Sequence, residues 1–474
     1  MRTARAARSM RVAALLAALI SMSGCALKTP PTPSELQPQA LPHTAVPAAW
    51  KAARADTQPV TGQWLATFND PVLSALVDEA MAYNTDLQVA AARVEQAAGY
   101  LRVASGSLLP SVGAVGLAGG KSGGGGGGLQ GLFLNASLEL DLWGRLRYAE
   151  AGAQAQSDAV AADFAYARQS LAAMVARSWL LAIEARLQVS IAKEAVRSSE
   201  SLLNVTNDRL RVGNGNAQAV AQARAGLGSY RDGLQQAELA REQAARALEL
   251  LLGRYPATEI QVAAQLPAMP APVPVGLPSQ LLERRPDVVA AERRVAAAFN
   301  RVGEAQAAQL PRISLTAGGS NVSSDLFVLK DTSNPVWSFG ANLIAPLYQG
   351  GALQAQVDIR SAEQKQAVAD YARAGQRAFG EVEGALGAEA SLRTRDAILQ
   401  TAIIDNEEAL RLAQTQYRVG SADLRAVEQN QLALYAARST RLRVQTEQLT
   451  QRVNLYLALG GDFGPPAMEV VAKQ

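Results

Sequence analysis

The chain contains 474 residues, of which 49% are hydrophobic, and this composition excludes a wholly disordered protein. Aromatic residues make up only 5% while alanine is abundant, a balance that favours long helices packed through small side chains over a thick aromatic core. The formal net charge of +3 includes four arginines near the N-terminus, so the remainder carries 3 − 4 = −1, which gives no reason to expect nucleic-acid binding.

The first 24 residues are predicted to be a signal peptide. The four arginines precede a short apolar segment at residues 12–20, and small residues follow directly before Cys25. The apolar segment is too short for a membrane-spanning helix. The four residues Met22-Ser23-Gly24-Cys25 resemble a bacterial lipobox, which implies that Cys25 is lipidated and becomes the first residue of the mature protein. The alternative is that Cys25 is a free structural thiol.

Cys25 is the only cysteine of the chain and His43 is the only histidine. One cysteine cannot form a disulfide within the chain, and His43 lies in a proline-rich segment, so a Cys-based metal site or a Cys/His nucleophile is excluded. We expect no metal and no cofactor other than the covalent lipid on Cys25. Residues 25–63, which are rich in proline, are predicted to form an extended, poorly structured tether behind that lipid.

Residues 64–266 are predicted to form a first structural repeat. Asn69-Asp70-Pro71 is a helix start signal, and a further helix is expected from about residue 85 until Pro110 stops it. Strands are predicted at about 111–119 and 132–142, and the second alternates apolar and polar residues over the length of a strand that crosses a bilayer.

The glycine-rich segment between these strands contains Gly120-Lys121-Ser122, but it lacks the glycine spacing and the following helix of a phosphate-binding loop. Nucleotide binding is therefore not predicted. Residues 144–252 are predicted to form a long helical hairpin, because the segment lacks proline, keeps one apolar face at spacings of three, four or seven residues, and turns at Val212-Gly213-Asn214-Gly215.

Residues 267–278 form a proline-rich connector, and residues 279–462 repeat the first plan before a C-terminal tail at 463–474. The second repeat is predicted to contain strands at about 312–320 and 336–347 and a long helical hairpin at 349–460. Leu310-Pro311 follows Leu109-Pro110 at an offset of 201 residues, and Arg418-Val419-Gly420 follows Arg211-Val212-Gly213 at an offset of 207. A period this long indicates one large unit that has been duplicated rather than a solenoid.

Four strands of bilayer length cannot close a barrel, and open sheet edges in lipid leave backbone groups without hydrogen-bond partners. The chain is therefore expected to form an oligomer, and three copies supply twelve strands and twelve long helical segments. The spacing of Tyr435, Leu442, Leu449 and Tyr456 predicts coiled-coil packing between neighbouring helices. The alternative is an ordinary soluble sheet covered by helices.

Two segments carry a resemblance to a known family, namely LLERRPDVVAAERRVAAA from Leu281 and WLATFNDPVLSALVDEAMAYNTDL from Trp64. With the lipobox and the two glycine turns, they make the chain similar to outer-membrane efflux factors of the TolC family, in its lipoprotein (NodT-like) branch. The resemblance implies an α+β membrane protein that is a homotrimer, with a twelve-stranded β-barrel built from four strands per chain and continued by a long α-helical coiled-coil barrel.

The resemblance also implies partners and a location. The trimer would sit in the lipid of the outer membrane, extend into the periplasm, and meet a periplasmic adaptor protein and an inner-membrane transporter of the resistance-nodulation-division type. The family's hairpin turns face the adaptor, and by position these correspond to Val212, Gly213, Asn214, Gly215, Val419, Gly420 and Ser421. The alternative for each glycine is that it only closes the turn.

Acidic residues often form the family's periplasmic constriction just after the second turn, and the acids nearest to it in this sequence are Asp423 and Glu428. Carboxylates that face the lumen would favour cations, so both residues are candidates for a channel gate, and a solvated outer face is the alternative.

The expected function is conduction of small molecules from the adaptor and transporter to the exterior, without enzymatic chemistry. Two other functions remain open, a type I secretion outlet for proteins and a periplasmic coiled-coil lipoprotein that forms no channel.

Overall fold

The computed structural model describes residues 27–52, 62–117, 130–323 and 336–461. The predicted signal peptide, Cys25, Gly120-Lys121-Ser122 and the C-terminal tail lie outside these residues. The chain divides into two compact units. Unit 1 comprises residues 1–44, 92–162 and 289–374, and unit 2 comprises residues 45–91, 163–288 and 375–474.

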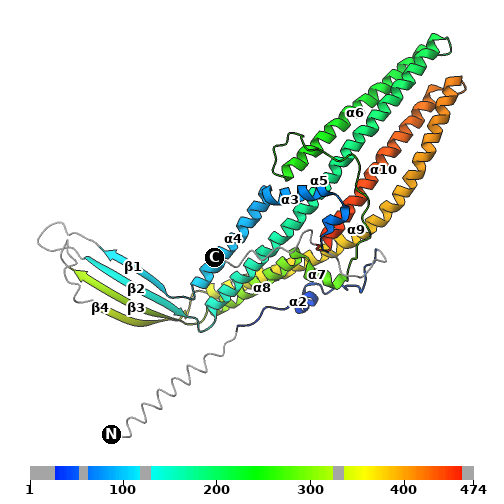
Figure 1. The fold of residues 1–474 in the computed structure, drawn as a ribbon. Coiled ribbons are helices and arrows are strands. Elements are labelled where there is room, and N and C mark those ends of the chain that lie inside the picture. The colour runs from blue at the N-terminus through cyan, green and yellow to red at the C-terminus, as the bar shows by residue number, and fades with distance from the viewer. Residues whose placement is uncertain (1–26, 53–61, 118–129, 324–335, 462–474) are drawn as a thin grey trace, which may run out of the picture. The chain divides into compact units, whose positions relative to one another are not determined.

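The helices and strands occur in two successive sets with the same order (Figure 1), preceded by the short helix α2 (Pro33–Ala40). The first set consists of η2 (Trp64–Phe68), α3 (Pro71–Tyr83), α4 (Thr85–Gly106), β1 (Ser111–Leu117), β2 (Gln130–Leu140), α5 (Arg145–Arg211) and α6 (Ala217–Leu251). The second set consists of η3 (Pro278–Gln280), α7 (Leu281–Arg284), α8 (Pro286–Ala307), β3 (Arg312–Ser323), β4 (Val336–Ile344), α9 (Ala352–Val419) and α10 (Leu424–Ala458).

Corresponding elements of the two sets begin at the offsets found in the sequence. Helix α8 begins 286 − 85 = 201 residues after α4, and α10 begins 424 − 217 = 207 residues after α6. The predicted internal duplication is therefore confirmed. The strands differ from their predicted bounds by a few residues, since β2 ends at Leu140 rather than at 142 and β4 ends at Ile344 rather than at 347.

Unit 1 contains a four-stranded antiparallel sheet in the order β1-β2-β3-β4. Beside it, α5 and α8 pack through small residues, and a Cβ built on Gly303 would lie 2.6 Å from the ring of Tyr148. Ala155, Ala296 and Ala297 are buried in the same region. This contact confirms the expectation from composition that helices pack closely through small side chains.

The expectation of an extended tether was wrong for part of residues 25–63. Helix α2 forms there, Glu35 completes a capping box with Thr32, and Leu36 is fully buried. The backbone N–H of Lys28 donates to the Tyr148 hydroxyl at 3.0 Å. The proline count suggested an extended chain, but proline is tolerated in the first turn of a helix, and Leu36 supplies an apolar anchor.

Unit 2 contains most of two long helical hairpins, the first formed by α5 and α6 and the second by α9 and α10. Helix α5 has 67 residues and α9 has 68. Along the described part of the chain, no helix is both long and apolar enough to cross a membrane.

The two hairpins share a core. Leu202 of α5 lies in one buried apolar cluster with residues of the second hairpin, including Ile403 and Val427. Of the four heptad positions predicted on α10, Leu442, Leu449 and Tyr456 are buried and Tyr435 is half-buried. The shared apolar cluster shows that the hairpins pack on each other, while Tyr456 stacks on Trp64 of η2.

A buried arginine joins the start of α8 to α9 and to the end of α10. Arg285 is fully buried and forms two hydrogen bonds to the Asp287 carboxylate, at 3.0 and 2.9 Å. It also donates to Glu381 at 2.6 Å and to the carbonyl of Ala458 at 3.1 Å. Arg377 donates to Asp287 at 3.1 Å. Within unit 2, this network therefore holds the first residues of α8, the middle of α9 and the end of α10 together.

Replacing Asp287 with asparagine is expected to lower the free energy of unfolding by about 3 kcal/mol at neutral pH, because the buried Arg285 loses a carboxylate partner. Burial raises the pKa of the Asp287 carboxyl, but Arg285 and Arg377 outweigh burial and hold that pKa below its ordinary value. A carboxyl whose pKa is lowered by folding stabilises the protein above its unfolded pKa, and this stability is lost as pH falls through its folded pKa. The deficit of Asp287→Asn relative to wild type should therefore shrink in acid, which denaturant titrations at neutral pH and at about pH 3 can measure.

Asn84 provides a matched control, because it occupies the position 285 − 84 = 201 residues earlier and is uncharged. Its Nδ2 donates to the carbonyl of Leu251 at 2.9 Å, just as Arg285 donates to Ala458. Asn84→Ala should cost about 1–2 kcal/mol at both pH values. A deficit of Asp287→Asn that stays constant into acid would contradict the role assigned to the ion pair.

Candidate functional site

One face of the sheet carries large apolar side chains that are exposed in the single chain. The cross-strand register places Leu138 opposite Leu315 and Ala317 opposite Phe339. The exposed fraction is 83% for Phe339 and 66% for Trp337. Soluble monomers rarely expose a continuous apolar surface of this kind, so this face requires a nonpolar environment.

The opposite face of the sheet is polar and lined by small side chains. Glu139, Ser314 and Asn342 form one row across β2, β3 and β4. The hydroxyls of Ser111 and Ser137 lie 2.8 Å apart on β1 and β2. The alternation predicted for the strands therefore separates an apolar face from a polar one, as in a strand with lipid on one side and water on the other.

The two hairpin turns have the same backbone geometry. Gly213 has a φ of 78° and Gly420 has a φ of 89°, a left-handed conformation that favours glycine. The residue after each glycine donates its N–H back to the helix, from Asn214 to Arg209 and from Ser421 to Gln416, each at 2.9 Å. The next helices are capped by Asn216 and Asp423. All seven predicted adaptor-facing residues are exposed: Val212, Gly213, Asn214, Gly215, Val419, Gly420 and Ser421.

The two predicted gate carboxylates have different surroundings. Asp423 is exposed and caps α10 by accepting the N–H of Ala426 at 2.9 Å. Glu428 is half-buried and accepts a hydrogen bond of 2.6 Å from the side chain of Gln222 on α6. The structure thus gives Asp423 a capping role and places Glu428 at the contact between the hairpins. Their role in a gate stays a prediction.

Arg209 joins the turn of the first hairpin to the second hairpin, and the sequence analysis did not identify it. Its guanidinium donates to the carbonyl of Tyr417 and, at 3.1 Å, to the carbonyl of Asn214. The guanidinium carbon lies 4.3 Å from the centroid of the Tyr417 ring. The corresponding residue 207 positions later is Gln416, so a side-by-side comparison of the two repeats could have singled out Arg209.

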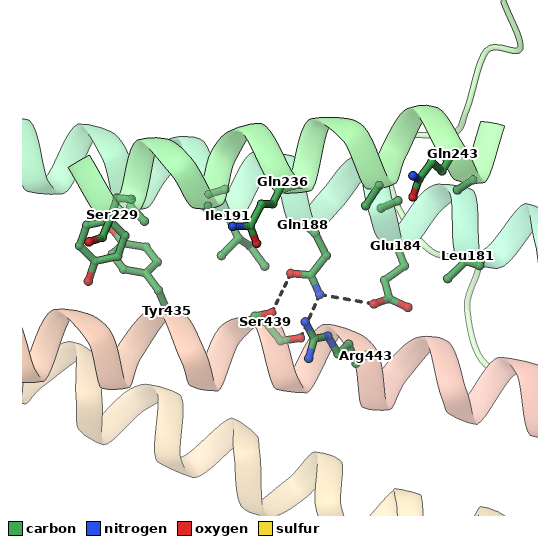
Figure 2. A pocket seen from close by; sticks show the side chains of 18 of the residues that line it. Leu181, Glu184, Gln188, Ile191, Ser229, Gln236, Gln243, Tyr435, Ser439 and Arg443 are labelled. Atoms are coloured by element: carbon green, nitrogen blue, oxygen red, sulfur yellow. Dashed lines mark hydrogen bonds between the residues drawn. The ribbon is translucent and has the colours of Figure 1, made fainter. Parts of the chain in front are cut away.

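A groove of about 680 Å³ lies between α5, α6 and α10 (Figure 2). Gln188 of α5 spans toward α10, where its Nε2 donates to the carbonyl of Ser439 at 3.1 Å and its Oε1 accepts the Ser439 hydroxyl at 2.8 Å. At one end of the groove the rings of Tyr230 and Tyr435 meet edge to face, with centroids 6.3 Å apart. Burial, reinforced by the charges of Tyr435 and Glu428, raises the pKa of Tyr230 to about 12.

The groove is lined mainly by neutral side chains together with Glu184 and Arg443, and its described residues do not pair a nucleophile with a base. Within the described residues, no group of three or more His, Cys, Asp or Glu side chains is placed to hold a metal ion. Cys25, the predicted lipid attachment site, lies outside the described residues, and its lipidation stays a prediction.

Comparison with known proteins gives a consistent result over both repeats. The sequence profile described as outer membrane efflux protein matches residues 76–254 and 277–461. The cation efflux system protein CusC of Escherichia coli is 32% identical over 409 residues, which cover 84% of this chain and 88% of CusC. The pyoverdine export outer membrane protein OpmQ of Pseudomonas aeruginosa is 31% identical over 477 residues, which cover 96% of this chain and 98% of OpmQ.

Solved structures agree with the sequence matches. The outer-membrane channel OprN superposes with a TM-score of 0.81 at 27% identity, covering 90% of this chain and 99% of OprN. A structure of CusC superposes with a TM-score of 0.78 at 29% identity, covering 89% of this chain and 99% of CusC. The predicted α+β fold and the resemblance found in the sequence are confirmed. The chain belongs to the outer membrane efflux protein family, whose members are efflux channel proteins and not enzymes.

Proposed function

We propose that the chain is the outer-membrane channel of a tripartite efflux system and works as a homotrimer. The observation that carries the proposal is the four-stranded sheet, which has one apolar face, one polar face, and edge strands β1 and β4 that each pair on one side only. Three copies would join these edges into a twelve-stranded barrel with the polar face around a water-filled lumen. The exposed hairpin turns are the surface offered to a periplasmic adaptor, which connects the channel to an inner-membrane transporter of the resistance-nodulation-division type.

The cargo is expected to be selected upstream of this channel. CusC and OpmQ are about equally similar to the chain, yet their names assign them to export of cations and of pyoverdine, which are chemically unlike. Because one channel architecture serves such different cargoes, we infer that the transporter selects the exported molecule. Within the channel, the carboxylates near the second turn would contribute only a preference for cations.

A variant without the lipid distinguishes a channel from the alternative, a periplasmic coiled-coil spacer. A Cys25→Ser variant exported by a signal peptide without a lipobox is expected to remain in the outer membrane and to require detergent for extraction, because the apolar face of the barrel still contacts lipid. Fractionation of membranes with carbonate and with detergent measures this. A spacer held only by its lipid would appear in the soluble periplasmic fraction instead. Single-channel recordings in planar bilayers, with wild type as the reference, test conduction directly.

The gate hypothesis can be tested without disturbing the local structure. Asp423→Asn retains a residue that caps helices well, and Glu428→Gln retains a side chain that can bond to Gln222. The double variant removes two carboxylates per chain, or six per trimer, so its cation selectivity in planar bilayers is expected to fall. Reversal potentials in a salt gradient give the selectivity. Selectivity equal to that of wild type would show that these carboxylates do not line the conduction path.

The contact made by Arg209 is expected to hold the turns of the two hairpins together. Arg209→Ala removes a charged donor from the carbonyls of Tyr417 and Asn214, so the population of open channels should rise by roughly tenfold, as inferred from the net worth of such hydrogen bonds. Open probability in bilayer recordings measures the effect. Arg211→Ala is the matched control, because Arg211 is exposed and, among the described residues, its ion pair is with Asp208 of its own helix. Equal behaviour of the two variants would contradict the assigned role of Arg209.

A further inference from the structure

We propose that neighbouring copies of this chain meet by packing α6 of one copy against α9 of the next, with Asp232 of the first paired with Arg395 of the second. The inference rests on the proposed trimer and names the surface and the side chains that would hold it together. It follows from the internal duplication, because the contact between hairpins inside one chain is a template for the contact between chains.

Inside the chain, α5 of the first hairpin and α10 of the second share several side-chain contacts, and α6 also touches α10 through Gln222 and Tyr230. Ser439 bonds to Gln188, and Arg438 forms an ion pair of 2.8 Å with Glu194. Three copies supply six hairpins, and a closed ring requires each hairpin to contact the next one. In the described part of the chain, α6 and α9 each keep an exposed face beside these internal contacts. These helices are the counterparts of α10 and α5, so they can meet in the same manner.

The exposure of individual residues supports this assignment. On α10, Gln431, Leu442 and Thr446 are 1%, 8% and 4% exposed. Their counterparts 207 positions earlier on α6 are all exposed in the single chain, and they are Arg224, Gln235 and Leu239. Leu239 alone is 53% exposed. Among the described residues, this face of α6 is therefore exposed, whereas α10 buries the corresponding face.

The receiving face on α9 shows the same difference. Ile191 of α5 is half-buried beside α10, whereas its counterpart Ile398 on α9 is 62% exposed. An exposed isoleucine at a position that is partly covered in the first hairpin indicates a surface that a second copy would cover.

Charge then identifies the partner as a copy of this chain. The counterparts of Ser439 and Gln188 are Asp232 and Arg395, which carry opposite charges and are both exposed. Asp232 accepts a hydrogen bond from Gln236 of its own helix at 2.6 Å. In the described part of the chain, Arg395 forms no ion pair. Since Ser439 and Gln188 approach to 2.8 Å, an aspartate and an arginine in the same arrangement would be within reach of an ion pair.

The two hairpins also have equivalent side-chain contacts next to Asp232 and Ser439. Arg438 pairs with Glu407 at 2.7 Å within the second hairpin, and its counterpart Arg231 pairs with Glu200 at 2.9 Å within the first. Arg231 is the neighbour of Asp232 along α6. The backbone therefore presents Asp232 on the first hairpin as it presents Ser439 on the second.

Disulfide trapping tests the pairing in the full-length protein in outer membranes. The variant with Asp232→Cys and Arg395→Cys, oxidised with copper phenanthroline, is expected to give bands of two and three linked chains on a non-reducing gel. The matched control carries Gln188→Cys and Ser439→Cys, which should link within one chain and give a shifted single-chain band. Wild type reports any background from Cys25. A further control replaces Arg395→Cys by Arg393→Cys, since Arg393 pairs with Glu389 of its own helix and lies two residues away.

The outcomes separate this inference from the proposed function. Multi-chain bands from the 232/395 variant, but not from the 232/393 variant, support the inference. A protein that is trimeric by light scattering in detergent and yields no linked chains at 232/395 overturns the pairing and leaves the channel proposal standing. A monomeric protein overturns the proposed trimer, and this inference with it.

Charge reversal provides a second readout that does not depend on cysteine. Asp232→Arg should lower the fraction of trimer that survives dilution in detergent by roughly two- to fivefold, which corresponds to the worth of an exposed ion pair. Combining it with Arg395→Asp should restore the wild-type fraction. Failure of the double reversal to restore the trimer, while each single reversal weakens it, would argue against direct pairing.

Discussion

The edges of the sheet impose the constraint on which the rest of the structure depends. Strands β1 and β4 each pair on one side only, and an unpaired strand edge in lipid leaves N–H and C=O groups without partners at a cost of several kcal/mol each. The apolar face of the sheet calls for lipid, so the edges have to be closed by other copies of the chain. The strands therefore need an oligomer to pair their edges, and the long hairpins must pack with the same symmetry as the strands.

The internal duplication helps to meet this requirement, because each chain contains the same structural unit twice. Three copies of the chain therefore supply six equivalent hairpins. The places where the two repeats differ then become informative. Asn84 bonds to the end of α6 and Arg285 bonds to the end of α10, each the second helix of its hairpin. Of the two, only Arg285 is charged, and it also bonds to Asp287 and Glu381. Arg209 near the first turn corresponds to Gln416 near the second. Six similar hairpins approach sixfold symmetry, whereas three chains have threefold symmetry. Differences of this kind mark the positions at which the two hairpins of one chain are not equivalent.

Much of this fold follows from sequence, for physical reasons that can be stated. Helix ends were predictable because only glycine adopts the positive φ of Gly213 and Gly420 at little cost. Strand β2 was predictable because apolar residues from Leu134 to Leu140 alternate with polar ones. The partner of Glu428 was not predictable, since Gln222 lies 206 positions away in the sequence and the contact depends on how the two hairpins come together. Helix α2 was not predicted because the many prolines indicated an extended chain. The burial of Leu36, which anchors the helix, depends on the folded structure.

The two versions of the hairpin contact differ in chemistry in a way that fits their different tasks. Hairpins within one chain are already connected, so the neutral pair Gln188 and Ser439, beside the ion pair of Arg438 and Glu194, does not have to select a partner. Separate copies must also select the correct arrangement. If α6 of one copy packed on α5 of another, Asp232 would face Gln188, and if α10 packed on α9, Ser439 would face Arg395. Either error leaves a charge without its partner, so the pair Asp232 and Arg395 favours the one order of hairpins in which the strands of the barrel can also close.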